Sequence, residues 1–162
     1  MKVNLEHKYS VDVDSLFALF QNPDFILERY LQTGSPSASL LELSDDDGVV
    51  IRVERVVLVD VPAFLGKFMQ PTTHVLQTEH WQGEVGGPYV NDMQVEIKGT
   101  PVKLHIGMKL VAKGKGCVNL VEIDAKCGIP LIGGKIADFV ARDAERTANL
   151  EYDFIKAYLK RK

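Results

Sequence analysis

The chain has 162 residues, of which 46% are hydrophobic, so it is long enough and apolar enough to form one globular domain with its own core. Its formal net charge of -3 argues against a nucleic-acid partner, which would require clustered Lys and Arg. The N-terminal residues contain no apolar segment typical of a signal peptide, and no later run approaches the roughly 18 apolar residues of a membrane span. We therefore expect one cytoplasmic domain, residues 1–162, without integral membrane association.

The first residues alternate in polarity. Val3, Leu5, His7 and Tyr9 alternate with polar and charged residues, which predicts a half-buried strand with this set facing inward. His7 thus lies on an apolar face. It can be a hydrogen-bonded core residue or a residue with a ligand-binding or catalytic role, and the sequence leaves both open.

Two short helices are predicted next. Asp12 or Asp14 can cap a helix that ends near Phe20, because the residue before Pro23 avoids the helical region. The second helix starts with Pro23 in its first turn and is expected to stop at Gly34.

From residue 38 onward the sequence alternates with a period of two for about ninety residues. Asp47 and Gly48 mark a hairpin turn, while the neighbouring acids lack the spacing of a calcium loop. The strands predicted after this turn cover residues 49–57, 73–82, 89–98, 104–113 and 117–126. No helix separates these strands, so we expect an antiparallel meander.

The segment 61–71 interrupts this pattern and carries large apolar side chains between two prolines. It is expected to be a short helix that plugs one end of the sheet, a mobile lid over a cavity, or both. The lid residues would be Phe64, Leu65, Phe68 and Met69.

The last predicted helix covers residues 132–162 and has no Gly or Pro after Lys135. About 28 helical residues give a rod near 42 Å, which needs a wide apolar surface to lie on. Asp143 and Thr147 fall in the middle of its apolar stripe. Either the helix rotates slightly and Asp143 pairs with a strand arginine such as Arg52 or Arg55, or both residues belong to a site.

This order of elements resembles the helix-grip fold of the START-like superfamily, which includes birch-pollen-allergen proteins, polyketide cyclases and coenzyme Q-binding proteins. The resemblance covers nearly the whole chain. It also rests on the insertion that begins with Pro62 and Ala63, on Trp81 at the end of the next strand, and on Gly133-Gly134-Lys135 before the last helix. These details look most similar to an uncharacterised bacterial branch of the superfamily.

The resemblance implies an α+β fold in which a curved, seven-stranded antiparallel sheet wraps around the long helix and encloses an apolar cavity. We expect a non-enzymatic carrier or sensor that binds a hydrophobic small molecule of lipid, polyketide or isoprenoid type there. The expected cavity residues are His7, Trp81, Met93, Met108, Phe139, Asp143, Thr147, Leu150 and Phe154.

Two alternatives remain open: a cyclase, dehydratase or hydrolase acting in the same cavity, and an interaction module whose interior is solid. The sequence contains no nucleophile elbow, zinc-protease pair or dinucleotide fingerprint. His74 and His80 lie about 20 Å apart along one strand, too far to share a metal ion. Cys117 and Cys127 lack the spacing of a zinc site or a disulfide framework, so we expect neither metal nor cofactor.

Overall fold

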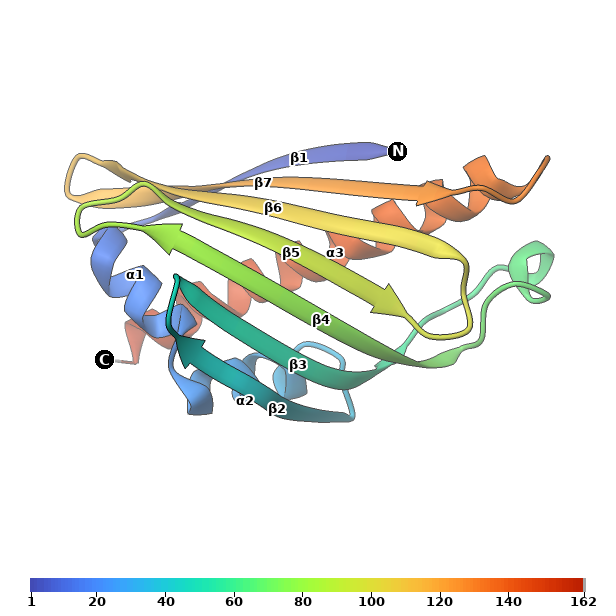
Figure 1. The fold of residues 1–162 in the computed structure, drawn as a ribbon, viewed down its shortest axis with the longest axis horizontal. Coiled ribbons are helices and arrows are strands. Elements are labelled where there is room, and N and C mark those ends of the chain that lie inside the picture. The colour runs from blue at the N-terminus through green and yellow to red at the C-terminus, as the bar shows by residue number, and fades with distance from the viewer. Residues whose placement is uncertain (162) are drawn as a thin grey trace.

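The computed structural model describes residues 1–161, and its elements follow the predicted order (Figure 1). The elements are β1 (Lys2–Tyr9), α1 (Val13–Phe20), α2 (Pro23–Gln32), β2 (Ser37–Asp45), β3 (Val49–Leu58), the short 3-10 helix η1 (Ala63–Leu65), β4 (Thr72–Gly83), β5 (Tyr89–Ile97), β6 (Val102–Lys113), β7 (Gly116–Cys127) and α3 (Gly133–Lys160). The predicted α+β class is confirmed.

The seven strands form one antiparallel sheet in the order β1-β7-β6-β5-β4-β3-β2. Strands β2 to β7 therefore pair with their neighbours in sequence, as the meander predicted, and β1 joins the free edge of β7. At the β2–β3 turn, Gly48 has φ +84°, and a Cβ there would lie 2.5 Å from the backbone oxygen of Trp81. A glycine is thus required at this turn by both conformation and space.

Side-chain caps separate the two short helices. Asp12 caps α1 by accepting from Ser15 N at 3.1 Å, and Asn22 caps α2 by accepting from Phe25 N at 3.1 Å, which confirms the predicted break before Pro23. Figure 1 shows α1 at one end of the sheet and α2 alongside the edge strand β2, while the η1 segment lies at the opposite end. The two ends of the sheet are thus closed by different elements.

Helix α3 spans 28 residues and crosses one face of the sheet, as predicted (Figure 1). Its first residue, Gly133, lies so close to β7 that a Cβ would be 2.4 Å from the backbone oxygen of Cys127. Lys162, included in the predicted helix, lies outside the described residues.

The buried face of α3 is rotated from the stripe that its large side chains predict. With Ile136 at 0° and about 100° per residue, the buried Ala137, Ala141 and Ile155 lie near 100°, 140° and 100°. Leu150, near 320°, is 42% exposed. Small alanines let the helix approach the sheet closely, so they form the contact face. A prediction based on large apolar side chains gives these alanines little importance.

Two hydrophobic clusters make up the core. The first, which we call the α1–α2 cluster, lies under the short helices and includes Phe20, Phe25 and Trp81. The second, the η1 cluster, joins the first half of α3 to strands β4 to β7 and includes Leu65 and Met69. Met108 packs against both clusters, so the two meet near the middle of the sheet.

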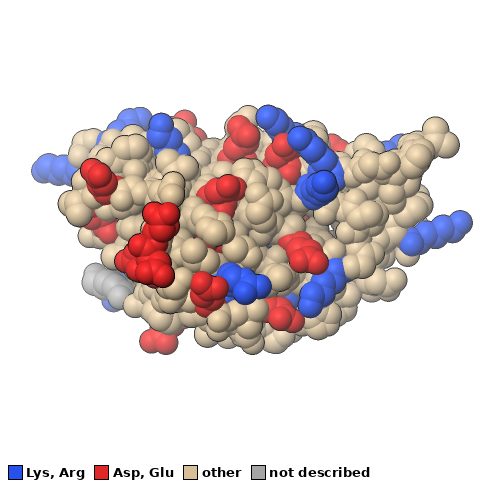
Figure 2. Space-filling view, viewed as in Figure 1, with Lys and Arg blue, Asp and Glu red and all other residues tan. Residues whose placement is uncertain are grey.

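Figure 2 shows positive and negative side chains interspersed over the face of the molecule in that view. Among the surface pairs, Lys98 lies 3.7 Å from Glu54, and His105 Nε2 lies 2.5 Å from Asp92 Oδ1. His105 is accessible to solvent, since its side chain is 41% exposed. No helix within residues 1–161 contains an apolar stretch long enough to cross a membrane.

Candidate functional site

A cavity of about 130 Å³ lies between α3 and the sheet, bounded by both hydrophobic clusters. The interior is therefore not solid. Ligand-sized pockets span about 300–1,000 Å³, and an engineered cavity of about 150 Å³ holds benzene. The cavity, by itself, matches a ligand of a few carbon atoms.

One end of the cavity is apolar. Its walls come from strands β4 to β7, from the first half of α3 and from the η1 segment, and they include Met69, Val75, Met93, Val95, Leu104, Val121, Ile123, Phe139 and Val140. These side chains belong to the η1 cluster or pack against it. Aliphatic and thioether groups without charge offer only shape and dispersion contacts, so this end suits a hydrocarbon group.

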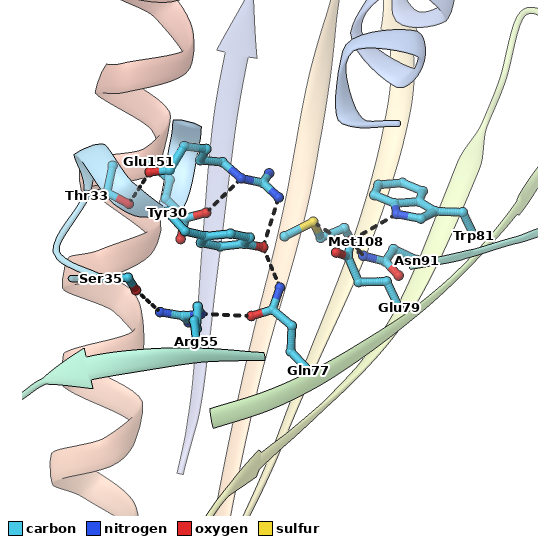
Figure 3. Close-up of polar contacts among 11 residues, drawn as sticks. Tyr30, Thr33, Ser35, Arg55, Gln77, Glu79, Trp81, Asn91, Met108 and Glu151 are labelled. Carbon is cyan, nitrogen blue, oxygen red and sulfur yellow. Dashed lines mark hydrogen bonds and ion pairs between the residues drawn. The ribbon is translucent and has the colours of Figure 1, made fainter. Parts of the chain in front are cut away.

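The other end is polar and is centred on Tyr30 of α2, as Figure 3 shows. Arg29 Nη2 donates to the Tyr30 hydroxyl at 2.9 Å, and Gln77 Nε2 also donates to it. Burial raises the pKa of Tyr30 to about 12, so the hydroxyl keeps its proton at neutral pH.

Arg29 is a buried cation with one carboxylate partner. Its Nε lies 3.4 Å from Glu151 Oε1 on α3, without a hydrogen bond at Nε. Burial alone would lower the pKa of Arg29, but Tyr30 and Glu151 more than offset this effect and hold it above its ordinary value. The charge of Arg29 is therefore neutralised within the fold.

Arg55 of β3 is a second cation on the cavity wall. Its Nε donates to Gln77 Oε1 at 3.3 Å and its Nη1 donates to Ser35 Oγ at 3.1 Å, and Figure 3 shows its side chain between these two residues. Its guanidinium carbon lies 4.8 Å from the centroid of the Tyr30 ring. Tyr30 thus contacts both arginines, since Arg29 lies 4.7 Å from the same centroid.

His7 lines the cavity and is tied to α3. Its Nε2 lies 3.0 Å from Asn149 Oδ1, and its ring stacks on Tyr152 with centroids 4.2 Å apart. Burial lowers the pKa of His7 despite the bond to Asn149, which favours the neutral imidazole. His7 is therefore hydrogen-bonded in the core and also faces the cavity.

A third polar group lies beyond the cavity, under α1. Glu79 Oε1 accepts from Trp81 Nε1 and from Asn91 Nδ2, each at 3.0 Å (Figure 3). Glu79 Oε2 and Asn91 Oδ1 make no hydrogen bond within the described residues. Burial raises the pKa of Glu79, while Arg29 and the two donors oppose this rise.

A shallower groove of about 450 Å³ adjoins the cavity. It runs between the C-terminal end of α2, the end of β3 and the second half of α3, and its lining residues are Gln32, Thr33, Gly34, Arg55, Val57, Leu58, Arg146, Thr147, Leu150 and Phe154. Arg55, Val57 and Thr147 line both hollows, so the groove and the cavity meet at these three residues.

Six of the nine residues predicted for the cavity line it in the structure. They are His7, Met93, Met108, Phe139, Asp143 and Thr147. Asp143 pairs with Arg146 at 2.9 Å on its own helix, so the predicted partners Arg52 and Arg55 are wrong. Arg146 lies three residues further along the same helix, so it is within reach of the Asp143 carboxylate however α3 is rotated against the sheet.

The other three predicted cavity residues lie elsewhere. Trp81 is 1% exposed and packs on Phe17 and Phe20, because α1 covers the end of β4 where it lies, about 20 Å along the strand from Val75. Leu150 and Phe154 line the groove instead. The rotation of α3 turns Leu150 outward, whereas Phe154 packs on Phe25 of α2, with ring centroids 6.1 Å apart.

The four predicted lid residues differ in exposure. Leu65 is completely buried and Met69 lines the cavity, whereas Phe64 is 59% exposed. Phe68 packs against the η1 cluster while partly exposed. The segment thus anchors into the core through two side chains and covers the apolar end of the cavity.

The polar end of the cavity was not predicted from the sequence, although a signal was present. Arg55 follows Val49, Ile51 and Val53 at steps of two, and Gln77 follows Val75, so strand alternation places both on the inner face. In α2, Arg29 follows Phe25 and Ile26 at steps of four and three, which places it on the buried face. A search for apolar periodicity passes over polar residues at these steps.

The cavity offers few groups for covalent chemistry. Among the described residues, its lining contains no serine or cysteine. Cys117 is a free thiol in the α1–α2 cluster, and burial raises its pKa to about 11, which disfavours the thiolate. No three His, Cys, Asp or Glu residues within the described chain are grouped so that they could hold a metal ion.

Solved structures with the same fold cover almost the entire chain. A START superfamily protein from Mycobacterium smegmatis has a TM-score of 0.66 at 11% identity, covering 97% of this chain and 98% of its own. Ara h 8.0201 has a TM-score of 0.64 at 18% identity, covering 100% and 99%. A protein from Thermus thermophilus has a TM-score of 0.63 at 13% identity, covering 98% and 99%.

The sheet, the two short helices and the long helix together define a START-like fold of the kind found in birch-pollen-allergen proteins. Within it, the chain belongs to the family described as "Protein of unknown function (DUF2505)", whose model matches residues 4–159. No curated protein matches the chain.

Proposed function

We propose that this protein binds a small hydrophobic molecule in the cavity beneath α3 and acts as a carrier or sensor. The observation that carries this proposal is an interior hollow with an uncharged, apolar end, where a continuous core would be more stable. An unfilled cavity costs stability because the side chains that line it lose dispersion contacts. A ligand would restore them.

The proposed contact residues fall into two groups. Met93, Met108 and Phe139 contact the apolar part of the ligand, while His7, Asp143 and Thr147 contact its polar atoms or a water molecule. Ligands longer than the cavity extend into the adjoining groove, which adds space in the range of ordinary ligand sites, about 300–1,000 Å³.

The test uses neutral probes, a series of alkan-1-ols from butanol to decanol. We expect saturable changes in the backbone amide chemical shifts of cavity residues, and a ligand adduct in native mass spectrometry of freshly purified protein. The proposal is contradicted if no alkanol changes these chemical shifts and the purified protein carries no adduct.

A matched pair of variants on α3 distinguishes the cavity from the surface. Ala144 lines the cavity, and the ring of Ala144→Phe would occupy a space close to that which benzene fills in a cavity of about 150 Å³. Ala157 is exposed on the same helix, so Ala157→Phe is the control. We expect the first variant to abolish alkanol binding and the second to leave it unchanged. Equal effects would place the alkanols on the surface.

We also propose that the segment 62–71 is the lid of this cavity. Its backbone hydrogen bonds are local, from Leu65 N to Pro62 O and from Phe68 N and Met69 N to Leu65 O, while Val59 N donates to Pro71 O at its base. Local opening should then require less free energy than global unfolding. Amide hydrogen exchange should be fast in residues 62–71 and slowed by added decan-1-ol. Protection equal to that of β4 and β5, unchanged by decanol, would identify a fixed plug.

A further inference from the structure

The junction of groove and cavity contains a cation without a carboxylate partner. Arg55, Val57 and Thr147 form this junction, and of the three only Arg55 is charged. Within the described residues, no Asp or Glu oxygen lies within ion-pair distance of Arg55, whereas Arg29 has Glu151 and Arg146 has Asp143. Arg55 is thus the uncompensated charge on the cavity wall.

Two hydrogen bonds orient the guanidinium of Arg55 and use two of its three nitrogens. Gln77 accepts from Nε and the buried Ser35 accepts from Nη1, but Nη2 makes no hydrogen bond with any described residue. A guanidinium stays protonated in proteins and presents its donors in a fixed plane. The fold therefore pre-orients a charged donor at the entrance to an apolar cavity.

A second donor lies on the opposite wall. The Thr147 hydroxyl lines both the groove and the cavity, and it has no hydrogen-bond partner in the described structure. The groove lining contains Arg55 and Arg146 but, among the described residues, no Asp or Glu. Asp143 and Glu151 also line the cavity, but they pair with Arg146 and Arg29, so Arg55 supplies the excess positive charge. Two donors on facing elements beside this charge match a head group with two acceptor oxygens and a negative charge.

We propose that the ligand is an amphiphile with a carboxylate head, bound with its head at Arg55 and Thr147 and its alkyl tail in the apolar end of the cavity. This inference rests on the proposed function, because the tail must enter the cavity. It adds the class of ligand and its direction of binding: the head lies at the groove and the tail points toward Met93 and Phe139.

The test compares octanoate with octan-1-ol, which share a tail length, by isothermal titration calorimetry at neutral pH and low salt. A charge-assisted hydrogen bond predicts that wild-type protein binds octanoate about tenfold more tightly. Octan-1-ol binding with no preference for octanoate overturns the inference and leaves the proposed function standing. Binding of neither probe overturns both.

Arg55→Met should remove the preference for octanoate while octan-1-ol affinity stays within about twofold. Arg52→Met is the control, since Arg52 lies on the outer face of the same strand and pairs with Glu42 at 4.0 Å; it should retain the preference. Loss of the preference in the Arg52 variant alone contradicts the site.

If Arg55→Met does not fold, Thr147→Val provides the second variant, with an expected loss in octanoate affinity larger than its loss in octan-1-ol affinity.

Octyl phosphate, which has the same tail, tests whether the head group is a carboxylate or a phosphate. Tighter binding of octyl phosphate than of octanoate overturns the carboxylate assignment, whereas weaker binding supports it.

Discussion

The buried pair of Arg29 and Glu151 offers the sharpest test of how the polar end of the cavity is stabilised. The side chains are 7% and 20% exposed, and the pair joins α2 to α3 at 3.4 Å. Arg29→Met leaves Glu151 without its cation and removes the 2.9 Å bond to Tyr30. Removing one partner of a buried pair costs about 3–5 kcal/mol, which for a domain of this size lowers Tm by about 6–20 °C.

The double variant Arg29→Met, Glu151→Met separates pairing from packing. Replacing both partners of a buried pair with apolar groups is often neutral, so the double variant should recover about 1 kcal/mol or more relative to the sum of the single variants. Urea unfolding, followed by the fluorescence of the single Trp81, measures each free energy of unfolding.

The matched control is Arg142→Met on the exposed face of α3. Arg142 lies 3.1 Å from Glu145 and is 57% exposed, so its loss should cost less than about 1 kcal/mol. If Arg29→Met costs no more than Arg142→Met, or if the single effects simply add in the double variant, the pair of Arg29 and Glu151 does not stabilise the fold.

Three further predictions follow from burial and space. Burial raises the pKa of Glu79 above its ordinary value near 4.5. As the pH rises, Glu79 therefore loses its proton in the unfolded chain before it does so in the folded protein, and the free energy of unfolding falls. The stability difference between Glu79→Gln and wild type should therefore grow with pH, and chemical denaturation giving a constant difference from pH 4.5 to 8 would refute this. Leu65→Ala should cost about 2–5 kcal/mol in urea unfolding, while the exposed Phe64→Ala should cost little; similar losses would mean that the segment 62–71 is not anchored through Leu65. Gly133→Ala would bring a Cβ to 2.4 Å from Cys127 O, so Tm should fall by several degrees in a thermal scan, and an unchanged Tm would show that α3 can start elsewhere.

The sequence was sufficient for the element order because the signals that set it are local. Strand alternation, the Asn22-Pro23 break and the turn at Gly48 each act within a few residues, and all three appear in the structure where the pattern predicts them. The antiparallel meander followed from the lack of helices between strands. Met93 and Met108, which were among the expected cavity residues, line the cavity in the structure.

The composition of the site depended on how elements separated in sequence pack against one another. The rotation of α3, set by its alanines against the sheet, turned Leu150 out to the groove. Asp143 paired with Arg146, three residues further along its own helix, rather than with a strand arginine. The position of α1 decided that Trp81 belongs to the core.

By itself, the sequence determined the class of fold, the order of its elements and the alternation of residues between the two faces of the sheet, because backbone propensity and polarity patterns are local. The tertiary structure decided which inward residues touch one another and which border empty space. Arg29, Arg55 and Gln77 meet at Tyr30 from α2, β3 and β4, and this convergence depends on the docking of helices, which no short sequence window encodes.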